Sequence, residues 1–154
     1  MYARILAVFT FWFLSCVPVE QQGIVVKVVD GDTFDILDAK VTTRVRLFGI
    51  DSPERGQAFN KKAKEFTDSL VAGKRVRIVV RDKDRYGRTV GDAYLEDGTY
   101  VNAAIVKAGY AWQFTQYSTD AGIAQLERVA RSNRRGLWQD ARAIPPWEFR
   151  KGKR

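Results

Sequence analysis

The sequence predicts an α+β fold that is dominated by a β-barrel, with five strands and about three helices packed against it. Five segments rich in β-branched residues are separated by turn residues, and three other segments carry apolar residues at helical spacing. They follow one another in the order β-β-β-α-β-β-α-α, which fits a five-stranded barrel. An antiparallel α+β sandwich fits the same order, so the pattern leaves both architectures open.

The first three strands are expected between residues 24 and 50. Residues 24–29 and 33–37 are β-branched runs joined by Asp30-Gly31-Asp32, which predicts a hairpin. Residues 42–50 alternate as one longer strand, with Thr43, Val45 and Leu47 on one face and Arg44, Arg46 and Phe48 on the other. This third strand is therefore expected to be buried on one face only.

The remaining elements follow the break at Pro53. Residues 57–72 carry Phe59, Ala63, Phe66 and Leu70 at helical spacing, and Gly73 then predicts the end of that helix. Residues 75–81 and 90–95 are predicted strands on either side of a charged loop. A short helix is expected at 101–108, and Ile123, Leu126, Val129 and Ala130 mark another that ends near Gly136.

One domain is expected, at residues 23–142, between a leader and a tail. Residues 1–22 are predicted to be an export leader, because Arg4 precedes the apolar run 5–14. Phe13-Leu14-Ser15-Cys16 resembles a lipobox, so lipidation at Cys16, ordinary cleavage between residues 17 and 22, and an uncleaved anchor all stay open. Each predicts an exported protein, secreted or periplasmic or held at the envelope. Residues 143–154 are expected to wrap the domain and to end in a mobile basic terminus.

Charge and composition limit the partners, the catalytic residues and the metal sites that this chain can have. The formal net charge of +8 favours a polyanionic partner. The chain has no histidine, which excludes histidine acid–base catalysis and histidine metal sites. Cys16 is the single cysteine, so a disulfide within the chain and a cysteine metal cluster are excluded as well. A bound metal would have to be a hard cation held by oxygen atoms.

Three short motifs carry most of the remaining charge pattern: Asp30-Gly31-Asp32-Thr33, Asp51-Ser52-Pro53-Glu54 with Arg46 ahead of it, and Asp84-Arg85-Tyr86-Gly87-Arg88. Each alone is typical of ordinary structure. The first is a common hairpin turn in which glycine supplies positive φ, the second suits a helix N-terminus capped by Ser52, and the third suits a solvated loop.

Together the motifs predict a phosphodiester site. A hard cation needs converging carboxylates and a carbonyl, which Asp32, Asp51 and the backbone of Ser52 could supply. Hydrolysis also needs a carboxylate that activates water and positive groups that stabilise the phosphate oxygens. Glu54 and two arginines have the required chemistry, and arginine suits a phosphate because its planar fork donates two hydrogen bonds.

The spacing of D-G-D-T, R-L-F-G-I-D-S-P-E and D-R-Y-G-R resembles the staphylococcal nuclease family, over residues 25 to 138. The resemblance implies an OB-fold, bound Ca²⁺, and endonucleolytic cleavage of DNA and RNA that leaves 3′-phosphate ends. It also implies roles for single residues: Asp32, Asp51 and the Ser52 carbonyl as calcium ligands, Glu54 as general base, Arg46 and Arg88 as phosphate-binding residues, and Asp30 just behind the calcium ligands.

The resemblance also assigns substrate contacts. Arg85 and Tyr86 match the loop that contacts the nucleotide, and Tyr117 lies in the segment expected to stack on bases. The chain departs from the family after Glu54, where it lacks a long surface loop. A monomer that prefers single-stranded substrate is expected, with no protein partner evident.

Two other classes of protein remain open on the sequence. One is a noncatalytic nucleic-acid-binding OB module, which would need the positive charge but not the acidic pair Asp32 and Asp51. The other is an exported envelope-associated protein that uses residues 150–154 to meet anionic lipid.

Overall fold

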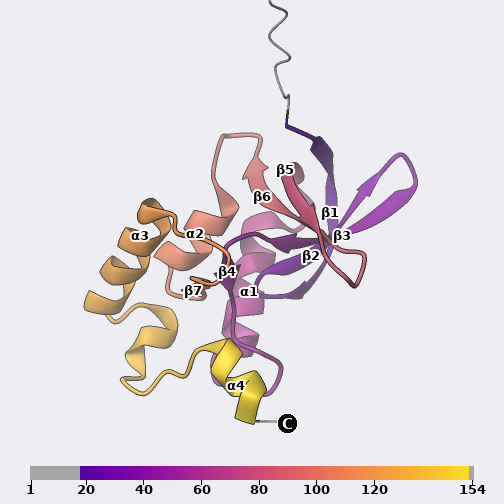
Figure 1. Cartoon of the computed structure of the whole chain (residues 1–154). Coiled ribbons are helices and arrows are strands. Elements are labelled where there is room, and N and C mark those ends of the chain that lie inside the picture. The colour runs from indigo at the N-terminus through magenta and orange to yellow at the C-terminus, as the bar shows by residue number, and fades with distance from the viewer. Residues whose placement is uncertain (1–17, 153–154) are drawn as a thin grey trace, which may run out of the picture.

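A closed five-stranded barrel forms the centre of the molecule in the computed structural model, which describes residues 18–152. Its strands are β1 (Glu20–Asp30), β2 (Thr33–Asp38), β3 (Val41–Leu47), β5 (Arg75–Lys83) and β6 (Thr89–Leu95). The strand order is β1-β2-β3-β6-β5, and the parallel β3–β6 pair and the antiparallel β1–β5 pair close the sheet (Figure 1). Closure excludes the open sandwich and confirms the predicted α+β barrel fold.

The two faces of β3 separate as predicted. Val45 and Leu47 are buried in the barrel core, whereas Arg44 is exposed and Arg46 is half-buried on the outer face. The same barrel interior holds Phe34 of β2 and Ile78 of β5, both fully buried. Residues two apart on a strand point to the same side, so burying Val45 and Leu47 fixes Arg44 and Arg46 outside the core.

The predicted hairpin forms between β1 and β2, but Gly31 has a different role in its turn from the one expected. Gly31 does not have a positive φ. A Cβ atom there would lie 2.8 Å from the Ser52 Cβ and 2.9 Å from the Ala63 Cβ. Glycine is therefore needed because the turn approaches two other segments closely. The side chain of Thr67 fixes this approach by donating a hydrogen bond to the Gly31 carbonyl at 2.8 Å.

The expectation of one continuous strand over residues 42–50 was wrong. The barrel strand ends at Leu47, and a turn with Gly49 at φ 70° leads into β4 (Ile50–Asp51), which pairs outside the barrel with β7 (Trp112–Gln113). The physical reason lies at Gly49, where a Cβ would meet the Cβ of the distant residue Ser118 at 2.7 Å and the backbone conformation favours glycine. The chain therefore leaves the sheet just before its acidic motif.

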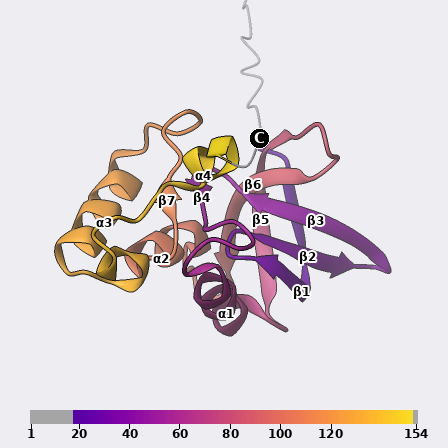
Figure 2. The same cartoon turned by 90° about the horizontal axis from the view of Figure 1, so that it is seen from below.

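Three helices cover the barrel close to the predicted positions. They are α1 (Asn60–Val71), α2 (Val101–Lys107) and α3 (Ala121–Ser132), followed by the 3₁₀ turn η1 (Gly136–Gln139). Helix α1 packs on β1, while α2 and α3 pack on each other beside the barrel (Figures 1 and 2). Helix α1 begins at Asn60, so Ser52 does not cap a helix and the simple helix-start interpretation of the acidic motif was wrong.

The tail contains a fourth helix that the sequence did not predict. Helix α4 (Pro146–Gly152) lies beside β4, on the side of the molecule where the chain has left the barrel (Figure 2). It replaces the expected mobile terminus as far as residue 152. At the other end, β1 begins at Glu20, inside the range predicted as leader, and Cys16 lies outside the described residues. Within residues 18–152, no helix has the length and hydropathy needed to cross a membrane.

Candidate active site

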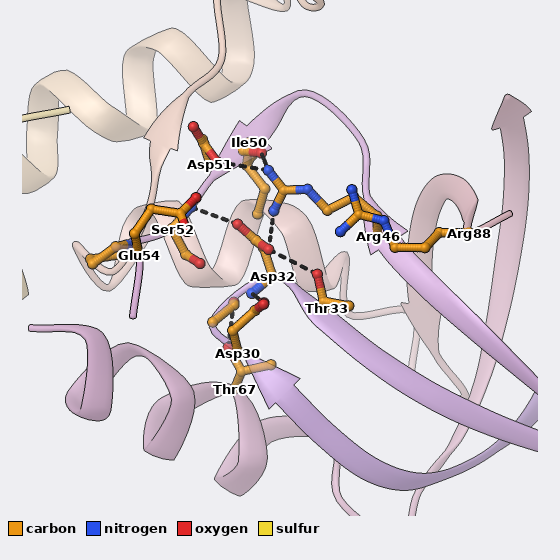
Figure 3. Close-up of polar contacts among 12 residues, drawn as sticks. Asp30, Asp32, Thr33, Arg46, Ile50, Asp51, Ser52, Glu54, Thr67 and Arg88 are labelled. Carbon is orange, nitrogen blue, oxygen red and sulfur yellow. Dashed lines mark hydrogen bonds and ion pairs between the residues drawn. The ribbon is translucent and has the colours of Figure 1, made fainter. Parts of the chain in front are cut away.

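Asp32 and Asp51 are brought together at one edge of the barrel by a single arginine. Asp32 ends the turn between β1 and β2, and Asp51 ends β4; both are buried. Arg46 of β3 lies between them, with Nη1 in an ion pair with Asp32 Oδ1 and Nη2 donating to Asp51 Oδ1 at 2.7 Å (Figure 3). Because one guanidinium group spans both carboxylates, the two aspartates face a common centre.

Ser52 and Asp30 hold Asp32 in place. The backbone N–H of Ser52 donates to Asp32 Oδ2 at 2.6 Å, and the Thr33 hydroxyl donates to Asp32 Oδ1 at 3.1 Å. Behind the turn, Asp30 Oδ1 accepts the Asp32 backbone N–H at 3.2 Å, so Asp30 lies where the sequence predicted it (Figure 3). These bonds fix the carboxylate that faces Arg46, which limits its motion at the centre.

Burial shapes the electrostatics of the centre. Desolvation raises the pKa of Asp30 above its usual value, opposed by the nearby positive charge of Arg46. Desolvation also lowers the pKa of Arg46, and the charges of Asp51 and Asp30 counter that effect. An arginine remains protonated in proteins at physiological pH, so the centre keeps a fixed positive charge beside its carboxylates.

Glu54 lies three residues beyond Asp51, in the segment between β4 and α1. Its backbone N–H donates to Gln57 Oε1 at 2.9 Å, and Asn60 Nδ2 donates to the neighbouring Pro53 carbonyl at 2.8 Å. The Glu54 side chain is about one-third exposed, so it borders the same centre from the solvent side. A carboxylate in this position can hold and deprotonate a water molecule.

Arg150 of α4 is a site residue that sequence reasoning missed. Its Nη2 donates to Asp51 Oδ2 at 2.8 Å, its Nη1 donates to Asp51 Oδ1 at 3.3 Å, and Nη1 also pairs with Glu54 Oε1. The segment Pro145-Pro146-Trp147-Glu148 carries a usable signal, because proline in the first turn and an early glutamate favour a helix start. No local pattern could show that this helix reaches Asp51.

Arg88 lies at the end of the β5–β6 loop, and its positive charge contributes to lowering the pKa of Arg46. The arginine is held inside its own loop, since Nε donates to Asp84 Oδ2 at 2.6 Å and its backbone N–H donates to Asp84 Oδ1 at 3.0 Å. Its side chain is 28% exposed. The loop thus presents a second guanidinium group at the barrel edge that carries Arg46 (Figure 3).

The predicted substrate-contact residues lie on the surface around this edge. Tyr86 is 70% exposed, and the Arg85 guanidinium lies 4.9 Å from its ring centroid. Tyr117 is 66% exposed and packs on Phe114, with ring centroids 4.8 Å apart. Within residues 18–152, neither tyrosine forms a hydrogen bond with the buried carboxylates. The Phe114 ring centroid, however, lies 5.9 Å from Arg150 Cζ, so Tyr117 is connected to Asp51 through Phe114 and Arg150.

A groove of about 420 Å³ runs along the outer face of the barrel beside Arg88. Its walls come from the hairpins β1–β2 and β2–β3 and from the β5–β6 loop, and they include Asp30, Thr33, Asp35, Arg44 and Tyr86. Arg44 is fixed on this wall by two bonds to Asp35, at 2.7 and 3.0 Å. The groove therefore joins the exposed Tyr86 loop to Arg88 and to Asp30, the residue whose side chain accepts the Asp32 backbone N–H.

The donor set of the centre fits a hard cation. Asp32 and Asp51 offer carboxylate oxygens, the ligands that hard cations prefer, and the two carboxylates lie within the span of one guanidinium group. The backbone group of Ser52 that contacts Asp32 is its N–H. Within residues 18–152, no cluster of three or more acidic, histidine or cysteine side chains is arranged to hold a metal. Paired carboxylates beside arginines are groups that metal-assisted phosphodiester hydrolysis can use.

Comparison with known proteins identifies the family. The family model described as staphylococcal nuclease homologue matches residues 44–140. An uncharacterized endonuclease of Escherichia coli is 42% identical over 146 residues, which cover 94% of each chain. A micrococcal nuclease of Shigella flexneri is 40% identical over 140 residues, covering 84% of this chain and 80% of that protein. The chain belongs to the staphylococcal nuclease family and is an enzyme of the nuclease class.

Proposed function

We propose that the protein is a calcium-dependent endonuclease that hydrolyses DNA and RNA to products with 3′-phosphate ends. The observation that carries the proposal is the buried arrangement in which Arg46 spans Asp32 and Asp51 at the edge of the barrel. Buried carboxylates facing a polyanionic substrate would repel it unless a cation joined them. Two such groups beside two arginines are therefore expected to serve metal-assisted phosphodiester hydrolysis.

Asp32, Asp51 and the Ser52 carbonyl are the proposed calcium ligands. When bound, Ca²⁺ would polarise the phosphate and neutralise part of its charge. The Asp32 carboxylate is already held by Ser52 and Thr33, so its position needs little adjustment. Calcium accepts irregular sets of oxygen ligands with water completing the shell, which suits a site with two carboxylates.

The remaining residues divide the chemical step between them. Glu54 is proposed to hold the attacking water and to accept its proton. Arg46 and Arg88 are proposed to donate hydrogen bonds to the phosphate oxygens as negative charge builds up on them. Their positions on β3 and on the β5–β6 loop allow them to approach one phosphate from two directions.

The substrate is proposed to be an unpaired strand bound by a monomer. Tyr86 and Tyr117 are both largely exposed, and exposed aromatic rings stack on bases that are not paired. Arg85 lies against Tyr86 and supplies a positive charge for a neighbouring phosphate. A duplex would keep its bases stacked on one another and away from these rings.

Hydrolysis of denatured DNA and of RNA by the purified protein tests the proposal. The assay is run with calcium, with magnesium and with a chelator, and Glu54→Gln serves as the control against a contaminating nuclease. We expect cleavage with calcium, none with chelator, and a loss of about 10²–10⁴-fold in kcat for Glu54→Gln. Analysis of the product ends should show 3′-phosphate.

The result that contradicts the proposal is equally specific. Folded wild-type protein that binds single strands but cleaves neither substrate with any metal would instead indicate a noncatalytic nucleic-acid-binding module. Full activity in both Glu54→Gln and Arg88→Met would show that the reaction takes place elsewhere.

We further propose that the protein is exported, as the apolar run 5–14 predicts. Mass spectrometry of the protein from its own cells distinguishes the three fates of the leader. A lipid mass on Cys16, a chain that starts between residues 17 and 22, and an intact first residue are the corresponding results. An intact chain found only in the cytoplasm would contradict export.

A further inference from the structure

The C-terminal helix α4 places Arg150 on two of the carboxylates that the proposed reaction uses. Arg150 donates to both oxygens of Asp51, at 2.8 and 3.3 Å, and it pairs with Glu54 as well. These contacts join residues 99 and 96 positions apart in the chain. They are charge-assisted hydrogen bonds, the strong kind, because donor and acceptor are both ionised.

Further contacts hold α4 in this position, since Trp147 also packs against the hydrophobic cluster that contains Trp112 and Trp138. The Trp147 ring stacks on Phe114 with centroids 5.4 Å apart and planes 5° apart, and Gln57 Nε2 donates to the Ile144 carbonyl at 2.5 Å. Pro146 is the only buried residue within the seven residues of the helix. A helix this short is not stable by itself, so its position depends on these docking contacts.

Arg150 and a cation need the same oxygen atoms. Asp51 Oδ1 already accepts from Arg46 and Arg150, and Oδ2 accepts from Arg150. A calcium ion binds directly to its ligand oxygens, and Arg150 takes Asp51 Oδ2, the oxygen that Arg46 does not contact, so with Arg150 bound both Asp51 oxygens face a guanidinium group. Glu54 is subject to the same conflict, since a water molecule held for attack needs the oxygen that Arg150 contacts.

We propose that α4 is an autoinhibitory strap, in which Arg150 competes with a divalent cation for Asp51 and blocks Glu54 while it is closed. The inference rests on the proposed function, because it takes Asp51 as a cation ligand. Cation binding then has two effects: it completes the site, and it releases the strap from Glu54. The two states exclude each other, so whatever favours the closed strap weakens cation binding by the same factor.

The strap is tested by titrating calcium into wild type, Arg150→Gln and Lys151→Gln in a calorimeter at one ionic strength. Both substitutions remove one positive charge from α4, but Lys151 is exposed at the helix end and contacts neither carboxylate. If the closed strap is populated about nine-tenths of the time, Arg150→Gln should bind calcium about tenfold more tightly, while Lys151→Gln should match wild type.

Each result of the titration decides between the alternatives. Equal affinity in all three proteins, or equal tightening in both variants, overturns the strap. If all three proteins bind calcium equally and still hydrolyse DNA, the strap is wrong and the proposed function stands. If none binds calcium and none cleaves DNA, the proposed function fails together with the strap.

Hydrogen exchange gives a second measurement that does not depend on activity. In wild type, calcium should speed exchange of the backbone amide hydrogens of residues 147–152, because the helix loses its docking contacts. In Arg150→Gln the exchange should already be fast and should not respond to calcium. Exchange in wild type that calcium leaves unchanged would overturn release of the strap.

Discussion

The barrel edge and the β5–β6 loop each carry one arginine of the candidate site, but they hold it in different ways. Arg46 on β3 is 14% exposed and is locked between two buried aspartates. Arg88 at the end of the loop is twice as exposed and is held by Asp84 of the same loop. The position of Arg46 is fixed by the barrel sheet, whereas the position of Arg88 depends on the local structure of a short surface loop.

The two regions are therefore expected to have different roles: the barrel edge stabilises the fold, and the loop contacts the substrate. Groups on strands keep their geometry because the sheet fixes their backbone, which suits residues that must act on a transition state. Groups on loops can adjust to a bound strand, and Tyr86 and Arg85 are on the same loop as Arg88. Removing Arg46 should therefore damage the fold, and removing Arg88 should damage catalysis alone.

The largest effect is expected for Arg46→Met. This change leaves Asp32 buried without its ion-pair partner, so the free energy of unfolding at pH 7 should fall by about 3–5 kcal/mol. Urea unfolding measures it, and Arg44→Met on the exposed face of the same strand is the control. A loss below about 1 kcal/mol, the size typical of surface ion pairs, would show that Arg46 does not stabilise the centre.

The next effect is expected for Arg88→Met. Turnover of denatured DNA should fall about 10²–10³-fold, because a donor to the phosphate oxygens is lost in the transition state. The free energy of unfolding should change by no more than about 0.5 kcal/mol, since the side chain lies on a loop. If unfolding were affected as strongly as in Arg46→Met, the contrast between the two regions would be wrong.

A smaller effect is expected for Tyr86→Ala. Binding of single-stranded DNA should weaken by about 1–3 kcal/mol, which should raise KM with little change in kcat. Tyr86→Phe keeps the ring and should bind like wild type. If the phenylalanine variant loses as much affinity as the alanine variant, stacking on this ring is not the source of binding.

The smallest effect is expected for Arg44→Gln on the groove wall. The hydrogen bond and charge of Arg44 lower the pKa of Asp35, so the pair stabilises the fold above the unfolded-state pKa of about 3.9. That contribution is lost as pH falls through the lower pKa of the folded state. Arg44→Gln should cost about 0.2–1 kcal/mol at pH 7 and nothing in strong acid. A loss that is independent of pH would point to packing instead.

Several residues of the site were predicted from the three motifs together with the family resemblance that those motifs carry. Asp32, Arg46, Asp51 and Ser52 lie together as expected, and Glu54 borders them. They could be predicted because each lies at or near the end of a short strand, where local sequence fixes the turn and the face. Tyr117 was harder to place, since it is on a segment whose course depends on packing against Phe114.

Two features could not be predicted from local pattern. Alternation continues from Thr42 to Ile50, yet the strand ends early because Gly49 packs against Ser118, a residue far along the chain. The basic tail had the composition of a free terminus, yet Trp147 and Arg150 dock it. In both cases the deciding contact joins distant segments, and hydrophobic periodicity contains no information about such contacts.

The sequence by itself determined the α+β class, the order of the five barrel strands and the first three helices, the buried face of β3 and the motifs that carry the two aspartates and their arginines. Those features depend on side-chain alternation and turn chemistry, which act over a few residues. Only the tertiary structure decided that one guanidinium group spans Asp32 and Asp51 and that Arg150 reaches the same carboxylate. Their positions depend on closure of the barrel and on docking of the last helix, which bring residues about one hundred positions apart within hydrogen-bond distance.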